Sequence, residues 1–525
     1  MIKKLLLCIL ISVSMMGGVL APPAFGIDDN IEFYVSPAGK DTNTGSFENP
    51  FKTIKRAKEE VSKYTQNMAE DIYVYIRGGT YYVDETITFT EQDSGRNGYT
   101  VHYVNYADEQ PVIYGGVRLS DWEPYQGGIY KTYVPDDMDF YALTENFEWA
   151  TEACYPNEGY LSVASSGFSD GLNTALYFKD GDIPNNLSLE GLRVKSLPHL
   201  HYASATWPVT KIDRERNILH MNSKGEQFAI KYTEGEGIYR LIGNLSLLDM
   251  PGEFYLDREE GVLYYYPYND NINDSVIVAP CVKRIFGFIG DGADNPVENI
   301  SISGLTLSTT DFAESFHQGD LMGNVAGADA MIKLEDAKNI SITDCKLLNA
   351  GINAIWLKGF AQDNNISGNF IKNVGYVGVS LIGYTAREAM GRFDSLEDAY
   401  CNKNNIIHML RNIQGLRYTF DIGNFLCVQE DVLKAYKLFK EYIQNVHIKD
   451  WIYDEFGYLI RPEIPALNGC VMGEGILPLT ELLSNMKEDG FDGELLLEIN
   501  TVSITKEIIE KSVDFVKSKW GDSLC

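Results

Sequence analysis

The chain has little positive charge and few cysteines. Its 525 residues include 44 lysines and arginines against 74 aspartates and glutamates, which gives a formal net charge of −30 and a sequence pI of about 4.6. A nucleic-acid partner requires a basic surface that replaces phosphate counterions, so no nucleic-acid partner is expected. The eight cysteines are scattered without Cys-x-x-Cys spacing, and they support neither a disulfide framework nor a cysteine metal site.

Long apolar runs are equally scarce, because the sequence contains only one. Residues 5–21 follow the basic start Met1-Ile2-Lys3-Lys4 and precede Ala24-Phe25-Gly26, whose small residues suit a cleavage site. A single membrane anchor is the alternative, and Ser12 and Gly17 within the run disfavour it. We expect residues 1–26 to be a bacterial-type signal peptide, the protein to be secreted, and no stable membrane anchor to remain after cleavage.

An internal repeat precedes His408, where the character of the sequence changes. Four residues recur after 24 positions: Ile342, Asn349, Gly351 and Gly359 correspond to Ile366, Asn373, Gly375 and Gly383. Residues 300–307 match 340–347 at a spacing of 40, with the extra length between them. A period in the twenties with inward β-branched residues predicts a coiled parallel sheet, whereas a β-sandwich keeps no fixed period. We expect a mostly β chain, with a right-handed parallel β-helix over residues 27–408 interrupted by an inserted β region at about 120–270.

Several motifs of this part resemble a known group of proteins. The motifs are Phe33-Tyr34-Val35-Ser36-Pro37, Asn49-Pro50-Phe51, Ile76-Arg77-Gly78-Gly79-Thr80-Tyr81, Ala153-Cys154-Tyr155-Pro156-Asn157 and Pro251-Gly252-Glu253-Phe254-Tyr255. Together they resemble the secreted right-handed β-helix glycoside hydrolases of the pectin-lyase-like type, in the branch that acts on fucosides or xylan. The resemblance implies a polysaccharide or oligosaccharide partner, and no cofactor for the β-helix.

Cleavage of a glycosidic bond usually requires two carboxyl groups that flank the bond. The carboxylates near the repeat coils are Asp311, Asp329, Glu335, Asp336, Asp344 and Asp394. Asp311 follows Thr309 and Thr310 at a coil exit, and we predict it as the catalytic candidate. The alternative for each of these residues is a carboxylate that serves only a turn.

After residue 408, strands and helices alternate in the manner of a β/α barrel. Asp421, His447 and Glu498 each stand at or near the C-terminal end of a predicted strand, the end that forms the active-site face of such a barrel. Carboxylates with an imidazole suit a divalent metal, namely Mn²⁺, Mg²⁺, Co²⁺ or Zn²⁺. The alternative for His447 is a hydrogen-bonded structural residue.

This segment resembles the C-terminal part of the xylose-isomerase-like sugar phosphate isomerases and epimerases. The motifs are Asp421-Ile422-Gly423-Asn424, His447-Ile448-Lys449-Asp450, Gly473-Glu474-Gly475 and Leu497-Glu498. The resemblance implies that Asp421, His447 and Glu498 bind the metal and that Glu498 is also an acid/base. Asn424, which stands where many members carry histidine, is assigned to substrate binding. A full barrel needs eight strands, and residues 409–525 supply about three, so we expect a partial barrel.

Three functions remain open from the sequence. The first is a secreted carbohydrate-active β-helix protein, similar to glycoside hydrolases acting on plant or host polysaccharide, with an incomplete catalytic site. The second is a metal-dependent sugar or sugar phosphate isomerase or epimerase formed by the C-terminal segment. The third is a non-catalytic fusion of two enzyme fragments. The signal peptide and the missing strands disfavour the second.

Overall fold

The computed structural model describes residues 31–382 and 417–521, except for 136–137, 165–174, 198–203, 223–236, 270, 313–328, 428–429, 455–458, 462–463 and 500–504. The predicted signal peptide, Asp394 and the junction near His408 therefore lie outside the described residues. Within the described ranges, no helix is long and apolar enough to cross a membrane.

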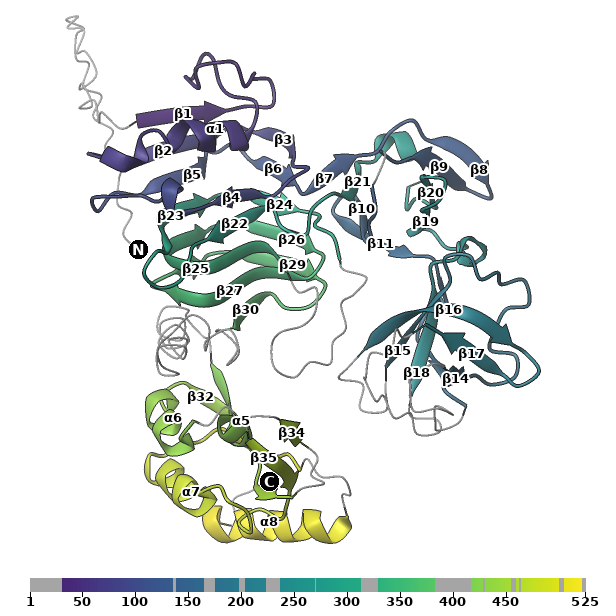
Figure 1. Ribbon diagram of the computed structural model, residues 1–525, viewed down its shortest axis with the longest axis vertical. Helices are drawn as coiled ribbons and strands as arrows, with labels where there is room; N and C mark the ends of the chain where they lie inside the picture. Colours follow the sequence, from purple (N-terminus) through teal and green to yellow (C-terminus); the bar gives the residue numbers. More distant parts are fainter. Residues whose placement is uncertain are drawn as a thin grey trace, which may run out of the picture.

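Two parallel sheets run along the first part of the chain (Figure 1). The strands of the first sheet are β1 (Ile31–Val35), β2 (Ile72–Ile76), β4 (Ile87–Phe89), β5 (Val101–Asn105), β22 (Phe286–Ile289), β23 (Val297–Ser303), β25 (Ala330–Thr343), β27 (Asn353–Gln362), β28 (Asn365–Ser367) and β30 (Val379–Ile382). Those of the second are β3 (Gly79–Tyr82), β6 (Pro111–Tyr114), β24 (Thr306–Ser308), β26 (Lys346–Ala350) and β29 (Phe370–Val374). The chain passes from one sheet to the other and back, so successive passes stack as coils.

The spacings of 40 and 24 residues seen in the sequence are the distances along the chain between residues that pair in neighbouring coils. Ile302 pairs with Ile342 across β23 and β25, and Ile342 pairs with Ile366 across β25 and β28. Ile302 and Ile342 are completely buried, so each adds about 1.5–3 kcal/mol to the free energy of unfolding. The predicted stacking of Ile342 on Ile366 is confirmed.

Asparagine and glycine lie where β26 and β29 end and the chain leaves the second sheet. Asn349 and Asn373 both have left-handed backbone, with φ of 56° and 58°, and the Asn373 Nδ2 donates to Asn349 Oδ1 at 3.1 Å. A Cβ at Gly351 would lie 2.2 Å from the Asp311 carbonyl, and one at Gly375 would lie 1.9 Å from the Gly351 carbonyl oxygen. Only glycine permits the backbones of neighbouring coils to come this close.

A helix belongs to the hydrophobic core at the start of the stack. Thr53 caps α1 (Ile54–Val61) by accepting a hydrogen bond from the Arg56 N–H, and Ile54, Ala57 and Val61 are buried with the coil residues. The short helices η1 (Thr65–Asn67) and η2 (Glu91–Asp93) follow. Ile54, Ala57 and Val61 follow helical spacing, so they form one apolar face of α1, and this face is the buried one.

Two mainly antiparallel sheets lie between β6 and β22 and have hydrophobic cores of their own. The first contains β7 (Gly116–Arg118), β8 (Glu123–Gln126), β9 (Ile129–Tyr133), β10 (Leu143–Glu145), β11 (Glu148–Glu152), β19 (Glu253–Asp257), β20 (Val262–Tyr265) and β21 (Ile277–Pro280). The second contains β12 (Cys154–Tyr155), β13 (Leu161–Ser162), β14 (Ala175–Tyr177), β15 (Arg193–Leu197), β16 (Ala205–Asp213), β17 (Ile218–Met221) and β18 (Ile238–Ile242). The short helix η3 (Leu245–Leu247) lies between the second sheet and β19 of the first, and η4 (Ile272–Asp274) lies between β20 and β21 of the first. We call these two sheets the insert.

The C-terminal segment alternates parallel strands with helices. Its parallel strands are β31 (Tyr418–Asp421), β32 (Ile443–Ile448) and β36 (Glu494–Leu497), in the order β31-β32-β36. Its helices are α5 (Ile422–Cys427), α6 (Val432–Phe439), α7 (Leu479–Glu488) and α8 (Lys506–Trp520). A small antiparallel sheet of β33 (Trp451–Tyr453), β34 (Leu459–Arg461) and β35 (Ile464–Gly469) follows β32 and was not predicted.

Candidate functional site

Three predicted metal ligands meet at one edge of the C-terminal parallel sheet. Asp421 ends β31, His447 lies opposite it on β32, and Glu498 directly follows β36. One ligand atom from each residue lies within 4.8 Å of the others, and His447 Nδ1 is 3.0 Å from Glu498 Oε2. Parallel strands end at the same edge of a sheet, which is why residues far apart in the sequence converge here.

Lys449 belongs to the same cluster and was not assigned a role from the sequence. Its side chain is almost fully buried, and its Nζ lies 2.9 Å from both Asp421 Oδ2 and Glu498 Oε1. Burial alone would lower the pKa of Lys449, but the two carboxylates raise it overall. Lys449 lies two residues after His447, so strand alternation could have indicated that both face the cluster.

Asn424 contacts the cluster through Asp421. Its Nδ2 donates to Asp421 Oδ2 at 2.9 Å, and its backbone N–H donates to Oδ1 at 3.3 Å. Its side chain is otherwise exposed, so the structure places the residue predicted to bind substrate at the rim of the cluster.

The donor set fits a divalent cation. Two carboxylates and an imidazole are ligands that Mn²⁺, Mg²⁺, Co²⁺ and Zn²⁺ accept, and here Asp421, His447 and Glu498 would hold the ion. When bound, such an ion would polarise the oxygens of a sugar. Lys449 contacts one oxygen of each carboxylate, Asp421 Oδ2 and Glu498 Oε1, whereas Glu498 Oε2 lies beside His447 Nδ1.

Most of the carboxylates considered near the coils serve the scaffold. Asp329 forms an ion pair with Arg284, and Glu335 forms ion pairs with two lysines. Asp336 is buried and accepts hydrogen bonds from the backbone N–H groups of Gly292 and Phe360. Asp344 occupies a corner with φ of 53°.

Asp311 has different surroundings. Its side chain is 7% exposed, its Oδ1 accepts a hydrogen bond from the Tyr141 N–H at 2.8 Å, and the Phe312 N–H also bonds to it. Burial raises the pKa of Asp311 to about 7. Asp311 is therefore a carboxyl group that gains and loses its proton near neutral pH. Tyr141 and Phe312, whose backbone N–H groups bond to it, both line a pocket.

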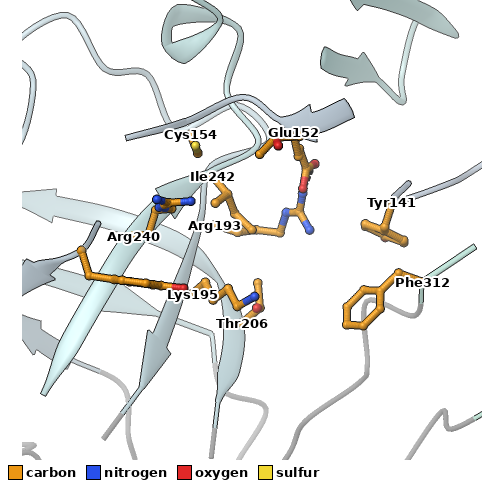
Figure 2. Close-up of a pocket in the computed structure, with 11 residues that line it drawn as sticks. Tyr141, Glu152, Cys154, Arg193, Lys195, Thr206, Arg240, Ile242 and Phe312 are labelled. Carbon is orange, nitrogen blue, oxygen red and sulfur yellow. Dashed lines mark hydrogen bonds and ion pairs between the residues drawn. The ribbon is translucent and has the colours of Figure 1, made fainter. Parts of the chain in front are cut away.

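This pocket lies where the coil meets the insert (Figure 2). It has a volume of about 190 Å³ and is lined by Tyr141, Thr151, Glu152, Cys154, Tyr160, Arg193, Lys195, Thr206, Arg240, Ile242 and Phe312. The Arg193 guanidinium forms an ion pair with Glu152 and lies 5.2 Å from the centre of the Tyr141 ring. Of these residues only Cys154 stands in a motif noted in the sequence. The others had no such signal, because most of the strands that carry them pair only in the folded insert.

Comparisons with known proteins give a family match and a structural match. Residues 388–519 match the model of the family described as xylose isomerase-like TIM barrel. A solved structure titled "Glycoside hydrolase" superimposes with a TM-score of 0.56 at 17% sequence identity and covers 68% of each chain, so the two share a fold.

One curated protein of Bacillus subtilis (strain 168), the uncharacterized protein YwoF, is 38% identical over 134 residues. The matched segment is 25% of this chain and 26% of that protein, so the chain spans about a quarter of the length of this relative.

Proposed function

We propose that this chain is a secreted carbohydrate-active protein of the right-handed parallel β-helix type, and that it binds a polysaccharide in the pocket between the coil and the insert. The observation that carries the proposal is the pocket itself, which combines aromatic rings with charged side chains. Asp311 lies beside it and accepts hydrogen bonds from two of the residues that line it, Tyr141 and Phe312. Sugars are recognised by flat apolar surfaces together with a few fixed polar groups.

The handedness and the location belong to the same proposal. Connections between parallel strands of one sheet are right-handed in about 98% of cases, which favours a right-handed coil. Secretion is supported by the basic start and apolar run of residues 1–26.

Asp311 and Glu152 are the carboxyl groups that we assign to hydrolysis. A glycosidase needs one carboxyl that is protonated at working pH and one that is ionised. The raised pKa of Asp311 suits the acid, and we assign Glu152, which is ion-paired with Arg193 in the pocket wall, as the second carboxyl group.

The test is to assay the purified protein for binding of oligosaccharides and for cleavage of aryl fucosides and xylosides. We expect binding in the wild type, and cleavage that falls by at least about 100-fold in Asp311→Asn and Glu152→Gln, as for loss of a general acid or base. Asp329→Asn is the matched control, because Asp329 pairs with Arg284 outside the pocket. Binding without cleavage would favour a non-catalytic glycan-binding protein, and absence of binding would refute the proposal.

Metal-dependent sugar isomerisation is the second candidate, and the convergence of Asp421, His447 and Glu498 favours it. Only β31, β32 and β36 form the parallel sheet among the described residues, whereas a barrel closes with eight strands. We therefore expect little ketose interconversion on addition of Mn²⁺. Robust metal-dependent isomerisation without glycan binding would reverse this ranking.

A further inference from the structure

The pocket between the coil and the insert concentrates positive charge in a chain that is strongly acidic overall. Its walls carry Arg193, Lys195 and Arg240 but one carboxylate, Glu152. Across the whole sequence, acidic residues outnumber basic ones by 74 to 44. The charge of this concave site therefore has the opposite sign to that of the molecule around it.

The strand register places two of the cations directly opposite each other. Lys195 on β15 pairs with Arg240 on β18, and Thr206 on β16 lies on the other side of Lys195. Like charges in this position repel and destabilise a sheet. The pKa of Lys195 is lowered, mainly by burial and also by the positive charge of Arg240. Both effects disfavour a second positive charge at this position.

The three cations differ in what already holds them. Arg193 pairs with Glu152, and Arg240 donates to the carbonyl oxygen of Gly159 and lies over the Tyr160 ring. Lys195, by contrast, has no carboxylate within ion-pair distance among the described residues. Figure 2 shows its side chain extending along the wall beside Thr206, on the side of the pocket opposite Phe312.

We propose that this pocket binds one anionic sugar unit, whose carboxylate or sulfate group is held by Lys195 and Arg240. This proposal rests on the glycan-binding function above and specifies the class of glycan. An anion between the two cations would replace their repulsion with two attractions, and Arg matches the planar geometry of a carboxylate. Phe312 lines the same pocket from the end of the coil, and its ring offers an apolar surface to the sugar.

The size of the pocket limits the ligand. Sites for drug-sized molecules have volumes of about 300–1,000 Å³, whereas this one has about 190 Å³. It therefore accommodates a single unit of a chain, with the neighbouring units outside. Uronate and sulfated sugars present the same charge, so the experiment must separate them.

The experiment is a calorimetric titration of the full chain with four ligands: a uronate oligosaccharide, a sulfated oligosaccharide, a neutral xylo-oligosaccharide of equal length, and inorganic phosphate. We expect one of the two anionic oligosaccharides to bind about tenfold more tightly than the neutral one, as for one added charge-assisted hydrogen bond. This advantage should shrink as salt is raised, because the charges are partly exposed.

Variants of Lys195 test the site. Lys195→Gln should remove the preference for the anionic oligosaccharide, and Lys195→Arg should retain it. Lys195→Gln should not lower the melting temperature of the free protein, because the substitution relieves repulsion from Arg240. Lys211→Gln is the control, since Lys211 lies on the adjacent strand β16, pairs with Asp213 and does not line the pocket.

The results that would contradict this proposal can be told apart from those that would contradict the proposed function. Equal binding of neutral and anionic oligosaccharides, or unchanged anionic binding in Lys195→Gln, would overturn the anionic specificity and leave glycan binding intact. Inorganic phosphate that binds as tightly as the anionic sugar would overturn the assignment to a sugar. Absence of binding by every oligosaccharide would overturn both this proposal and the proposed function.

Discussion

At the scale of single residues, the surroundings of a carboxyl group decide whether it holds a proton. Asp311 and Glu145 are both buried, but Glu145 accepts hydrogen bonds from Tyr265, Asn269, Ser275 and the Tyr268 N–H. Burial opposes ionisation of Glu145, yet these bonds hold its pKa below its usual range. Asp311 has fewer partners, and burial raises its pKa to about 7.

This difference predicts a pH dependence of stability. Between about pH 4 and pH 7 the folded state holds a proton on Asp311 that the unfolded state has released, so the contribution of Asp311 to the free energy of unfolding falls as pH rises. The slope is at most about 1.4 kcal/mol per pH unit. Urea unfolding of wild type and Asp311→Asn from pH 5 to pH 8 should therefore show a stability difference that declines up to about pH 7 and then levels off.

Glu145→Gln provides the comparison. Because the pKa of Glu145 is lowered, its contribution is complete above its ordinary pKa of 4.5 and is lost only below it. Its stability difference from wild type should be flat from pH 5 to pH 8. A flat profile for Asp311→Asn as well would show that Asp311 is already ionised throughout this range.

At the scale of the element, the stacked coils allow a matched pair of substitutions. Ile342 is completely buried between two coils, whereas its neighbour Ile366 in the next coil is only partly buried. Ile342→Ala should cost about 2–5 kcal/mol of unfolding free energy, because it leaves a cavity. Ile366→Ala should cost clearly less in the same urea titration followed by circular dichroism. A larger cost at Ile366 would contradict the packing described.

The register of the coils could be predicted from the sequence. The β-rich insert at about 120–270 was also expected, but the pairing of its strands could not be predicted, for a physical reason. A coil pairs with the next coil at a constant separation, so Ile342 and Ile366 reveal the register as a period of 24. In the insert, Lys195 pairs with Arg240 across an antiparallel sheet in which no spacing repeats. The pocket depends on that pairing, so the sequence did not show that its residues come together.

The metal cluster could be predicted from the sequence only in part. Strand ends of a β/α unit meet at one edge, so the convergence of Asp421, His447 and Glu498 could be predicted from three short segments. The contact of Lys449 with both carboxylates depends on the depth at which each side chain lies, which the alternation of a strand does not specify.

At the scale of the whole molecule, the two candidate sites belong to separate hydrophobic cores. The C-terminal core is formed by residues of 420–516, whereas the coil and the insert have cores of their own. A ligand stabilises the unit that binds it by an amount that grows with its concentration relative to its dissociation constant. Two ligands should therefore act on two different thermal transitions.

The prediction concerns Mn²⁺ and the glycan added separately in a calorimetric melt. Mn²⁺ at 100 times its dissociation constant should stabilise the C-terminal transition by about 2.7 kcal/mol and leave the other transition unchanged. His447→Gln should abolish this shift, because one of the three donors is lost, while the shift caused by the glycan persists. Gln at His447 keeps the Lys449 contacts, so the variant should remain folded. If Mn²⁺ moved both transitions, or still acted on His447→Gln, the ion would bind elsewhere and the cluster would be an ion-pair network centred on Lys449.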